Sequence, residues 1–219
     1  MKTVNNPKSW ESQPSISSDG NSLVFASDRS GGFGGIDLYI VKKDKFGYWG
    51  APQNMGDVIN SKLNEKTPFF HVDGETMYYA SQKFPSLGGY DMFISKLGVD
   101  GNWKEPQNLG YPINSENDEL GMFVTTDGKT AYFCSNKLEG VGGWDLYSFD
   151  LYDKVKPERV LFVKGLISFL IKLFQYFFSK PWTNSLGSKV GEDTRDTISC
   201  LLYTSPSPRD VEESRMPSS

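Results

Sequence analysis

The sequence has little of the side-chain chemistry on which catalytic and metal sites depend. Its 219 residues include one histidine and two cysteines, so a zinc site built from His and Cys is not available. It also has no Gly-x-Ser-x-Gly segment, which the nucleophile elbow of a serine hydrolase needs. These absences argue against a catalytic function, and we expect neither a catalytic residue nor a cofactor.

A strong charge of one sign is also missing. The formal net charge is -4, and residues 200–219 contribute one of these negative charges. A small negative net charge gives no indication of the basic surface that nucleic-acid binding requires. The longest apolar stretch, 166–178, is flanked by Lys164 and interrupted by Lys172. It is too short for a transmembrane helix, whereas an interfacial amphipathic helix, and with it membrane contact, stays open.

The sequence does contain a repeat with a fixed offset of 54 residues, without gaps. Each copy of the repeat contains turn residues followed by short apolar runs. Such a repeat indicates structural units of the same kind that stack on one another. The residues that recur are Asp19, Gly20, Ser27, Gly35 and Asp37; Asp73, Gly74, Ser81, Gly89 and Asp91; Asp127, Gly128, Ser135, Gly143 and Asp145; and, in two copies only, Trp49 and Trp103.

Each repeat is predicted to form four short β-strands. An Asp-Gly pair between two apolar runs is a strong hairpin signal, and no helical period occurs inside a repeat. Apolar residues occupy adjacent positions, as in Val24-Phe25-Ala26, which is typical of a sheet covered on both faces. We therefore predict an all-β fold, an incomplete β-propeller of four-stranded blades, with a flat sandwich as the second choice.

The repeat also sets the predicted domain boundaries. A propeller fragment covers 1–152, with blades at about 14–62, 68–116 and 121–152 and the end of a preceding blade at 1–13. Two blades and most of a third do not close a ring of four to eight, so we expect a piece of a longer protein. Residues 153–167 are predicted to be a linker that leads into a new strand.

Three aspartates are the strongest candidates for a site. Asp37, Asp91 and Asp145 each follow a Gly-Gly pair, where a carboxylate can accept hydrogen bonds from the preceding turn or from the serine of the same copy. Recurrence favours a structural clamp, and calcium coordination is the minority hypothesis. Trp49 and Trp103 are predicted to be packing groups, with an exposed binding surface as the alternative.

His71 and Cys134 are better explained as ordinary structural residues. The histidine takes the place of Ser17 and Thr125 in the other copies, so a solvent-facing or blade-edge position is expected. The cysteine takes the place of Ala26 and Ala80, which predicts a small buried apolar group.

The repeat resembles the WD-like propeller repeat of the TolB type. Residues 13–29, Gln-Pro-Ser-Ile-Ser-Ser-Asp-Gly-Asn-Ser-Leu-Val-Phe-Ala-Ser-Asp-Arg, carry the resemblance, together with Gly-Gly-x-Asp-Leu-Tyr at 34–39. The copy with Trp-x-x-Pro-Gln-Asn-Leu-Gly at 103–110 is similar to propellers of Bacteroidota envelope proteins of the outer-membrane-protein-A family.

This resemblance implies a non-catalytic binding or scaffold module of the cell envelope, periplasmic or associated with the outer membrane. It implies protein partners, and contact with peptidoglycan through a domain that this sequence does not contain. It also implies that 159–165 open a regulatory-like β domain. The alternative is an accessory propeller of a peptidase or glycosidase.

The end of the chain departs from this pattern. Residues 168–199 are either an amphipathic helix, with polar residues three to four positions apart, or the product of a frame error. Residues 200–219 resemble a translated sequencing adapter, and such segments are excluded from fold reasoning.

Overall fold

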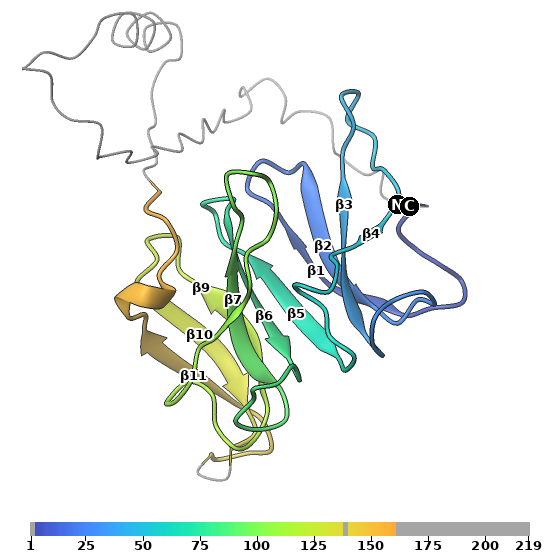
Figure 1. Cartoon of the computed structure of the whole chain (residues 1–219). Helices are drawn as coiled ribbons and strands as arrows, with labels where there is room; N and C mark the ends of the chain where they lie inside the picture. The colour runs from blue at the N-terminus through green and yellow to red at the C-terminus, as the bar shows by residue number, and fades with distance from the viewer. Residues whose placement is uncertain (1–2, 138–139, 161–219) are drawn as a thin grey trace, which may run out of the picture. The chain divides into compact units, whose positions relative to one another are not determined.

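The computed structural model describes residues 3–137 and 140–160 (Figure 1). Within these ranges every regular element is a β-strand, apart from one 3-10 helix at Asp153–Val155, which confirms the predicted all-β class. No helix of the described part is long and apolar enough to cross a membrane. The predictions for 161–167, for the helix in 168–199 and for the tail at 200–219 lie outside the described residues.

Three antiparallel sheets follow one another along the chain (Figure 1). Blade 1 has the order β1-β2-β3-β4, which are Glu11–Ile16, Ser22–Ser27, Asp37–Lys42 and Gln53–Asn54. Blade 2 has the order β5-β6-β7-β8, which are Glu65–Phe70, Thr76–Ser81, Asp91–Lys96 and Gln107–Asn108. Blade 3 consists of β9, β10 and β11, which are Glu119–Val124, Thr130–Ser135 and Asp145–Asp150.

The first strand of each blade starts before the apolar run that marks it in the sequence. β1, β5 and β9 begin at Glu11, Glu65 and Glu119, and the segment 1–13 therefore includes the start of β1. These first residues are polar or charged, so a search for apolar runs finds only the later part of each strand.

The Asp-Gly pairs form the turns between the first two strands of each blade. Gly20, Gly74 and Gly128 have φ values of 69°, 75° and 66°, which is the left-handed region that glycine enters without steric cost. Each of these glycines donates its N–H to the carbonyl three residues earlier. The turn fixes the register in which the second strand pairs with the first.

The first strands carry a bulge at equivalent positions. Gln13, Thr67 and Gly121 have φ values of 54°, 46° and 66°, and the pairing with the second strand shifts register there. The Gln13 side-chain oxygen accepts the Thr67 N–H at 3.0 Å, and the Thr67 hydroxyl accepts the Gly121 N–H at 3.1 Å. The bulges thus connect the first strands of successive blades.

Successive blades bury apolar residues between them, as the adjacent apolar positions predict. Between blades 1 and 2 the buried set is Val24, Ala26, Leu38, Ile59, Phe70, Met77, Tyr79 and Phe93. Between blades 2 and 3 it is Tyr78, Ala80, Met92, Ile94, Leu109, Ile113, Met122, Val124, Ala131, Phe133, Leu151 and Val155. Each fully buried side chain of Val, Leu or Ile size contributes roughly 1.5–3 kcal/mol to folding.

After β11 the chain folds back on blade 2. The Val155 carbonyl accepts the Tyr78 hydroxyl at 2.6 Å, and the Leu109 carbonyl accepts the Tyr152 hydroxyl at 2.7 Å. The N–H of Glu158 donates to the Asp73 carboxylate at 2.8 Å. Residues 151–160 therefore fasten blade 3 to blade 2 through contacts that have no counterpart in the other repeats.

Candidate functional site

One end of each blade carries a row of polar side chains across three strands. Glu11 pairs with Ser27, and Ser27 with Asp37, in the register of blade 1. The same row is Glu65, Ser81 and Asp91 in blade 2 and Glu119, Ser135 and Asp145 in blade 3. We call this end the loop face, because it carries the Gly-rich loops between the second and third strands and the connections 55–64 and 109–118 between blades.

The serine of each row donates to the glutamate. Ser81 donates to Glu65 at 2.7 Å, and Ser135 donates to Glu119 at 2.9 Å. In addition, Ser61 donates its N–H and hydroxyl to Glu65 at 3.0 and 2.6 Å, and Ser115 does the same to Glu119. These glutamates recur at the same 54-residue offset but are not among the residues predicted from the repeat.

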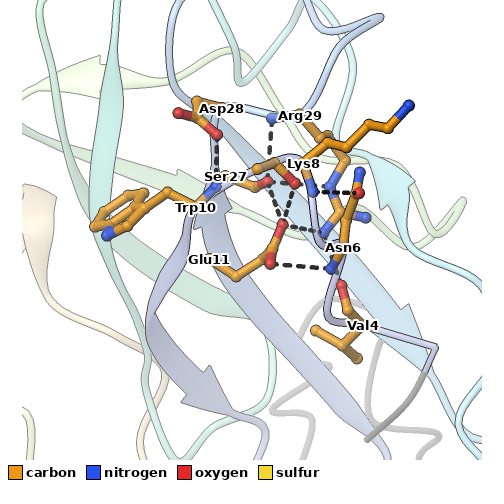
Figure 2. A network of polar contacts seen from close by, with 9 residues as sticks. Val4, Asn6, Lys8, Trp10, Glu11, Ser27, Asp28 and Arg29 are labelled. Carbon is orange, nitrogen blue, oxygen red and sulfur yellow. Dashed lines mark hydrogen bonds and ion pairs between the residues drawn. The ribbon is translucent and has the colours of Figure 1, made fainter.

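In blade 1 the glutamate has a cation beside it. Figure 2 shows the Glu11 carboxylate between Ser27 and Arg29, with the guanidinium at 3.2 Å and Asn6 donating its N–H at 3.2 Å. Arg29 also donates to the Val4 carbonyl at 2.9 Å. Lys83, one repeat further on, donates at 2.8 Å to the equivalent carbonyl of Val58 and pairs with Glu105 instead of Glu65.

The pKa values of the two glutamates, Glu11 and Glu65, are shifted in opposite directions. Burial opposes ionisation of Glu11, but hydrogen bonds from Ser9, Asn6 and Ser27, together with Arg29, outweigh it and hold the pKa of Glu11 below its usual value. For Glu65, burial dominates over the hydrogen bonds from Ser61 and Ser81, and its pKa is raised. The same residue type in the same row thus has opposite shifts, chiefly because Glu65 is fully buried whereas Glu11 is partly exposed, and Arg29 adds to the lowering at Glu11.

The aspartate of each row holds the Gly-rich loop. Asp37 accepts the N–H groups of Phe33 and Gly34 and the Asn54 side-chain amide, the latter two at 3.0 and 2.7 Å. Asp91 accepts the equivalent Leu87, Gly88 and Asn108 groups at 2.7, 3.2 and 2.7 Å. In blade 3, Asp145 accepts the Gly142 N–H at 3.0 Å.

The surroundings of these aspartates do not resemble a calcium site. Calcium needs six to eight oxygen ligands, whereas Asp37 and Asp91 are surrounded by N–H donors. Within residues 3–137 and 140–160 there is no group of three or more His, Cys, Asp or Glu side chains that could hold a metal. The minority calcium hypothesis therefore has no ligand set among the described residues.

Buried asparagines join the connections to the preceding blade. Asn60 accepts the Leu38 N–H at 2.8 Å and donates to the Leu38 carbonyl at 3.0 Å. Asn114 makes the same pair of bonds with Met92, at 2.7 and 3.0 Å. Each connection is thereby fixed to the third strand of the blade that it leaves.

His71 is buried directly after the end of β5, at the opposite end of the blades from the loop face, so of the two expected positions, solvent-facing or blade-edge, the solvent-facing one is wrong. Its ring is 1% exposed, and Nε2 lies 3.1 Å from the Thr125 carbonyl of the next blade. Nδ1 lies 3.5 Å from the carboxylate of Asp73. The histidine thus bridges blades 2 and 3.

Asp73 is the most strongly perturbed carboxyl group at this end. Burial opposes its ionisation, but hydrogen bonds from His71, from the Thr76 hydroxyl and N–H and from Glu75 outweigh burial and lower its pKa to about 2. The equivalent residues Asp19 and Asp127 are exposed. Asp73 differs from them because the Glu158 N–H, from the segment after blade 3, donates to its carboxylate.

The two tryptophans pack against the core rather than standing free. Trp103 lies with its ring centroid 5.8 Å from that of Phe70, and Trp49 packs against the apolar cluster of blade 1. Lys43 places its ammonium 4.9 Å from the Trp49 ring centroid. Both rings are partly buried.

The tips of the Gly-rich loops carry exposed apolar residues at equivalent positions. Phe33, Leu87 and Val141 are 50%, 52% and 102% exposed. Two of them are the residues whose N–H groups the aspartates accept. The loop face therefore presents one apolar side chain per blade from a fixed backbone.

No protein-family model and no curated protein matches the chain. Solved structures that it resembles include TolB from Acinetobacter baumannii, at 18% identity and TM-score 0.43, over 63% of this chain and 29% of that one. A putative TolB from Agrobacterium tumefaciens has 16% identity, TM-score 0.45 and coverage of 68% and 51%. An alpha-L-arabinofuranosidase from Lactobacillus brevis has 15% identity, TM-score 0.44 and coverage of 73% and 55%.

The chain thus spans less than two thirds of the length of each of these structures. Two of the three are TolB-type proteins, the type that the repeat sequence resembles. The assignment of the described residues to propeller blades rests on their own sheets and on the interfaces between them.

Proposed function

We propose that this chain is a non-catalytic propeller module that binds protein partners through its loop face. The observation that carries the proposal is the recurrence of an exposed apolar residue, Phe33, Leu87 or Val141, at the same place in each blade. Exposed residues of a single blade are ordinary. Three at equivalent positions of neighbouring blades repeat along one face, and apolar residues gathered on one exposed face are typical of interaction sites.

The hydrogen bonds below these tips favour binding. The carboxylates of Asp37 and Asp91 hold the backbone of the loops through two N–H groups each. A loop that is already held in its bound conformation loses less conformational entropy when a partner docks. Binding residues are in general concentrated on loops that a rigid scaffold positions.

The same hydrogen bonds argue against a catalytic role for the carboxylates. Glu65, Glu119, Asp37 and Asp91 are buried, and each accepts bonds from groups of its own blade or the adjoining connection. A general acid or base must reach a proton on a substrate. We therefore propose that these groups maintain the shape of the face and take no part in chemistry.

We further propose that the module belongs to a cell-envelope protein and is joined there to a peptidoglycan-binding domain. Support for this comes from the TolB-type repeat and from the Trp-x-x-Pro-Gln-Asn-Leu-Gly segment at 103–110. The rival, an accessory propeller of a hydrolase, makes a different prediction for the full-length gene. It requires a hydrolase domain beside the repeats, where our proposal requires a peptidoglycan-binding one.

Site-specific photo-crosslinking tests the loop face. A photoreactive phenylalanine analogue is placed at position 33 or 87 of the full chain, which is then mixed with a Bacteroidota envelope fraction and irradiated. Phe46, on the turn after β3 at the other end of blade 1, is exposed at 73% and serves as the control position. We expect discrete protein adducts from 33 and 87 but not from 46. No adducts, or the same adducts from all three positions, would contradict the proposal.

A further inference from the structure

The hairpin between β3 and β4 carries two exposed aromatic side chains at its tip. Phe46 is 73% exposed and Tyr48 is 72% exposed. The turn that bears them projects beyond the end of the blade 1 sheet (Figure 1). It lies at the end opposite the loop face, so these two rings are not part of the surface used in the proposed function. Large apolar groups that are exposed together mark an interaction site more often than single ones do.

Asp44 holds the tip of this hairpin in one conformation. Its Oδ1 atom accepts the N–H groups of Phe46 and Tyr48 at 2.8 and 2.9 Å. Its own N–H donates to the Tyr48 carbonyl at 2.8 Å, and Gly47, with a φ of 83°, donates to the Asp44 carbonyl at 3.0 Å. The acidic side chain of the turn is therefore used inside it, and the two rings project from a backbone that is already fixed.

Three lysines accompany the aromatic tip. Lys42 and Lys45 are exposed, and Lys43 is partly exposed. Lys43 and Lys45 place their ammonium groups 4.9 and 5.0 Å from the ring centroids of Trp49 and Phe46. Among the described residues none of the three lysines forms an ion pair. The hairpin thus has three positive charges against one negative charge, whereas the whole chain has a net charge of -4.

The equivalent hairpin of blade 2 has the same kind of turn but lacks this chemistry. Gly101 has a φ of 78°, and its N–H donates to the carbonyl three residues earlier, as that of Gly47 does. In place of Lys45, Phe46 and Tyr48, blade 2 has Val99, Asp100 and Asn102. The fold of a blade therefore does not require the aromatic rings or the lysine, and their presence in blade 1 indicates a role in binding.

Aromatic rings beside lysines suit the surface of an anionic lipid bilayer. Aromatic side chains with one polar end are enriched where a membrane meets water. Each lysine near an anionic lipid surface adds to the attraction, and its long side chain lets the ammonium group reach the headgroups while apolar groups lie deeper. A specific protein interface needs about 20–30 residues on each side, more than this one turn offers, whereas a bilayer accepts an isolated projection.

We propose that the hairpin between β3 and β4 binds the surface of an anionic lipid bilayer. Phe46 and Tyr48 enter the boundary between headgroups and acyl chains, and the three lysines contact the phosphates. The contact is peripheral and reversible, because one turn buries little apolar area, and it directs the loop face away from the lipid. It does not depend on the proposed function, and it is consistent with the absence of protein adducts expected at position 46.

Co-sedimentation of the full chain with vesicles tests this contact. One set of vesicles contains phosphatidylglycerol and phosphatidylcholine in equal parts, and the other contains phosphatidylcholine alone. We expect binding to the first set that weakens as the salt concentration rises, because salt screens the attraction of the lysines, and little binding to the second. A chain that binds neither set overturns the proposal and leaves an acidic protein as the occupant to test. Equal binding to both sets at all salt concentrations also overturns it.

Substitutions in the hairpin test the contributions of the rings and of the lysines. Phe46→Ser should lower the partition coefficient for the phosphatidylglycerol vesicles by about tenfold, because the ring no longer leaves water. Lys45→Gln should lower it by about fivefold, the effect of one basic residue near anionic lipid. Val99→Ser is the control, because Val99 is exposed on the equivalent hairpin of blade 2, and it should leave binding unchanged. Thermal melting verifies that each variant is folded.

Three results with these variants would overturn the proposal. Binding that survives both Phe46→Ser and Lys45→Gln places the lipid contact elsewhere in the chain, such as the apolar stretch 166–178. A loss with Lys45→Gln but not with Phe46→Ser means that the chain adsorbs by charge without insertion of the rings. An equal loss with Val99→Ser means that the hairpin of blade 1 has no special part in binding.

Discussion

At the residue scale, the carboxylates of this chain act mainly as hydrogen-bond acceptors for the backbone. Buried carboxylates are costly unless their oxygens are satisfied, and here nearby serines, asparagines and N–H groups satisfy them. How each one titrates depends on the depth of its burial and on its hydrogen-bond donors, as the opposite pKa shifts of Glu11 and Glu65 show.

Asp73→Asn should lower stability at neutral pH by about 2.5 kcal/mol, since a pKa of about 2 against the usual 3.8 corresponds to this amount at ~1.4 kcal/mol per unit. The folded-state pKa is depressed, so this contribution is present above pH 4 and is lost as the pH falls toward 2. Urea unfolding of both proteins between pH 2 and 7 measures it. Asp127→Asn changes the equivalent exposed residue and should have a much smaller effect.

Glu11→Gln and Glu65→Gln should change the pH dependence of stability in opposite directions. The pKa of Glu11 is lowered in the folded state, so its contribution is lost on acidification. The pKa of Glu65 is raised, so its contribution is present at low pH and is lost as the pH rises above its ordinary range. Stability curves from pH 3 to 8, relative to the wild type, measure both. Slopes of the same sign would contradict the difference in burial and hydrogen bonding between the two glutamates.

At the element scale, the sequence predicts the strands and turns that repeat. It does not predict a backbone conformation that residues of different types share. The Asp-Gly turns and the apolar second strands can be predicted because the same residue types recur at the same spacing. The bulge in the first strands cannot be predicted, because Gln13, Thr67 and Gly121 share only a left-handed backbone conformation. For the buried row, the repeat points to the aspartates and serines but not to the glutamates, because the strands begin with polar residues rather than with the apolar run.

Gly88→Ala tests the close approach of a Gly-rich loop to the next connection. A Cβ at Gly88 would lie 2.2 Å from the Asn117 carbonyl oxygen, a backbone atom that cannot rotate away. We expect a loss of about 1–3 kcal/mol, the usual cost of overpacking. At the equivalent Gly142 the nearest atom is 3.5 Å away, so Gly142→Ala should be nearly neutral. Equal losses in chemical denaturation would show that the loop of blade 2 does not lie on this connection.

At the scale of the whole molecule, one rule explains most of the fold. Blades 1 and 2 each bury one face of their sheet against the next blade, and the connections 55–64 and 109–118 are each fixed by an asparagine to the third strand of the blade that they leave. The repeat predicts this stacking. It does not predict how residues 152–160 pack on blade 2, because Tyr152, Val155 and Glu158 make contacts that the other copies do not make.

Removal of divalent metal should leave the stability of the whole molecule unchanged. Asp37 and Asp91 are held by N–H donors, so the folded state gains nothing from calcium at these positions. The thermal midpoint with excess chelator should equal that with added calcium. A rise of the midpoint with calcium that Asp91→Asn abolishes would restore the calcium hypothesis.

Amide hydrogen exchange at three equivalent residues tests the stacking of blades most directly. The N–H groups of Leu38 and Met92 donate to buried Asn60 and Asn114, whereas Leu146 is followed by no such asparagine at the next repeat position. In dilute monomeric protein we predict slow exchange at Leu38 and Met92 and fast exchange at Leu146. Fast exchange at either of the first two would contradict the account, because the connections would then not bind the blades they leave.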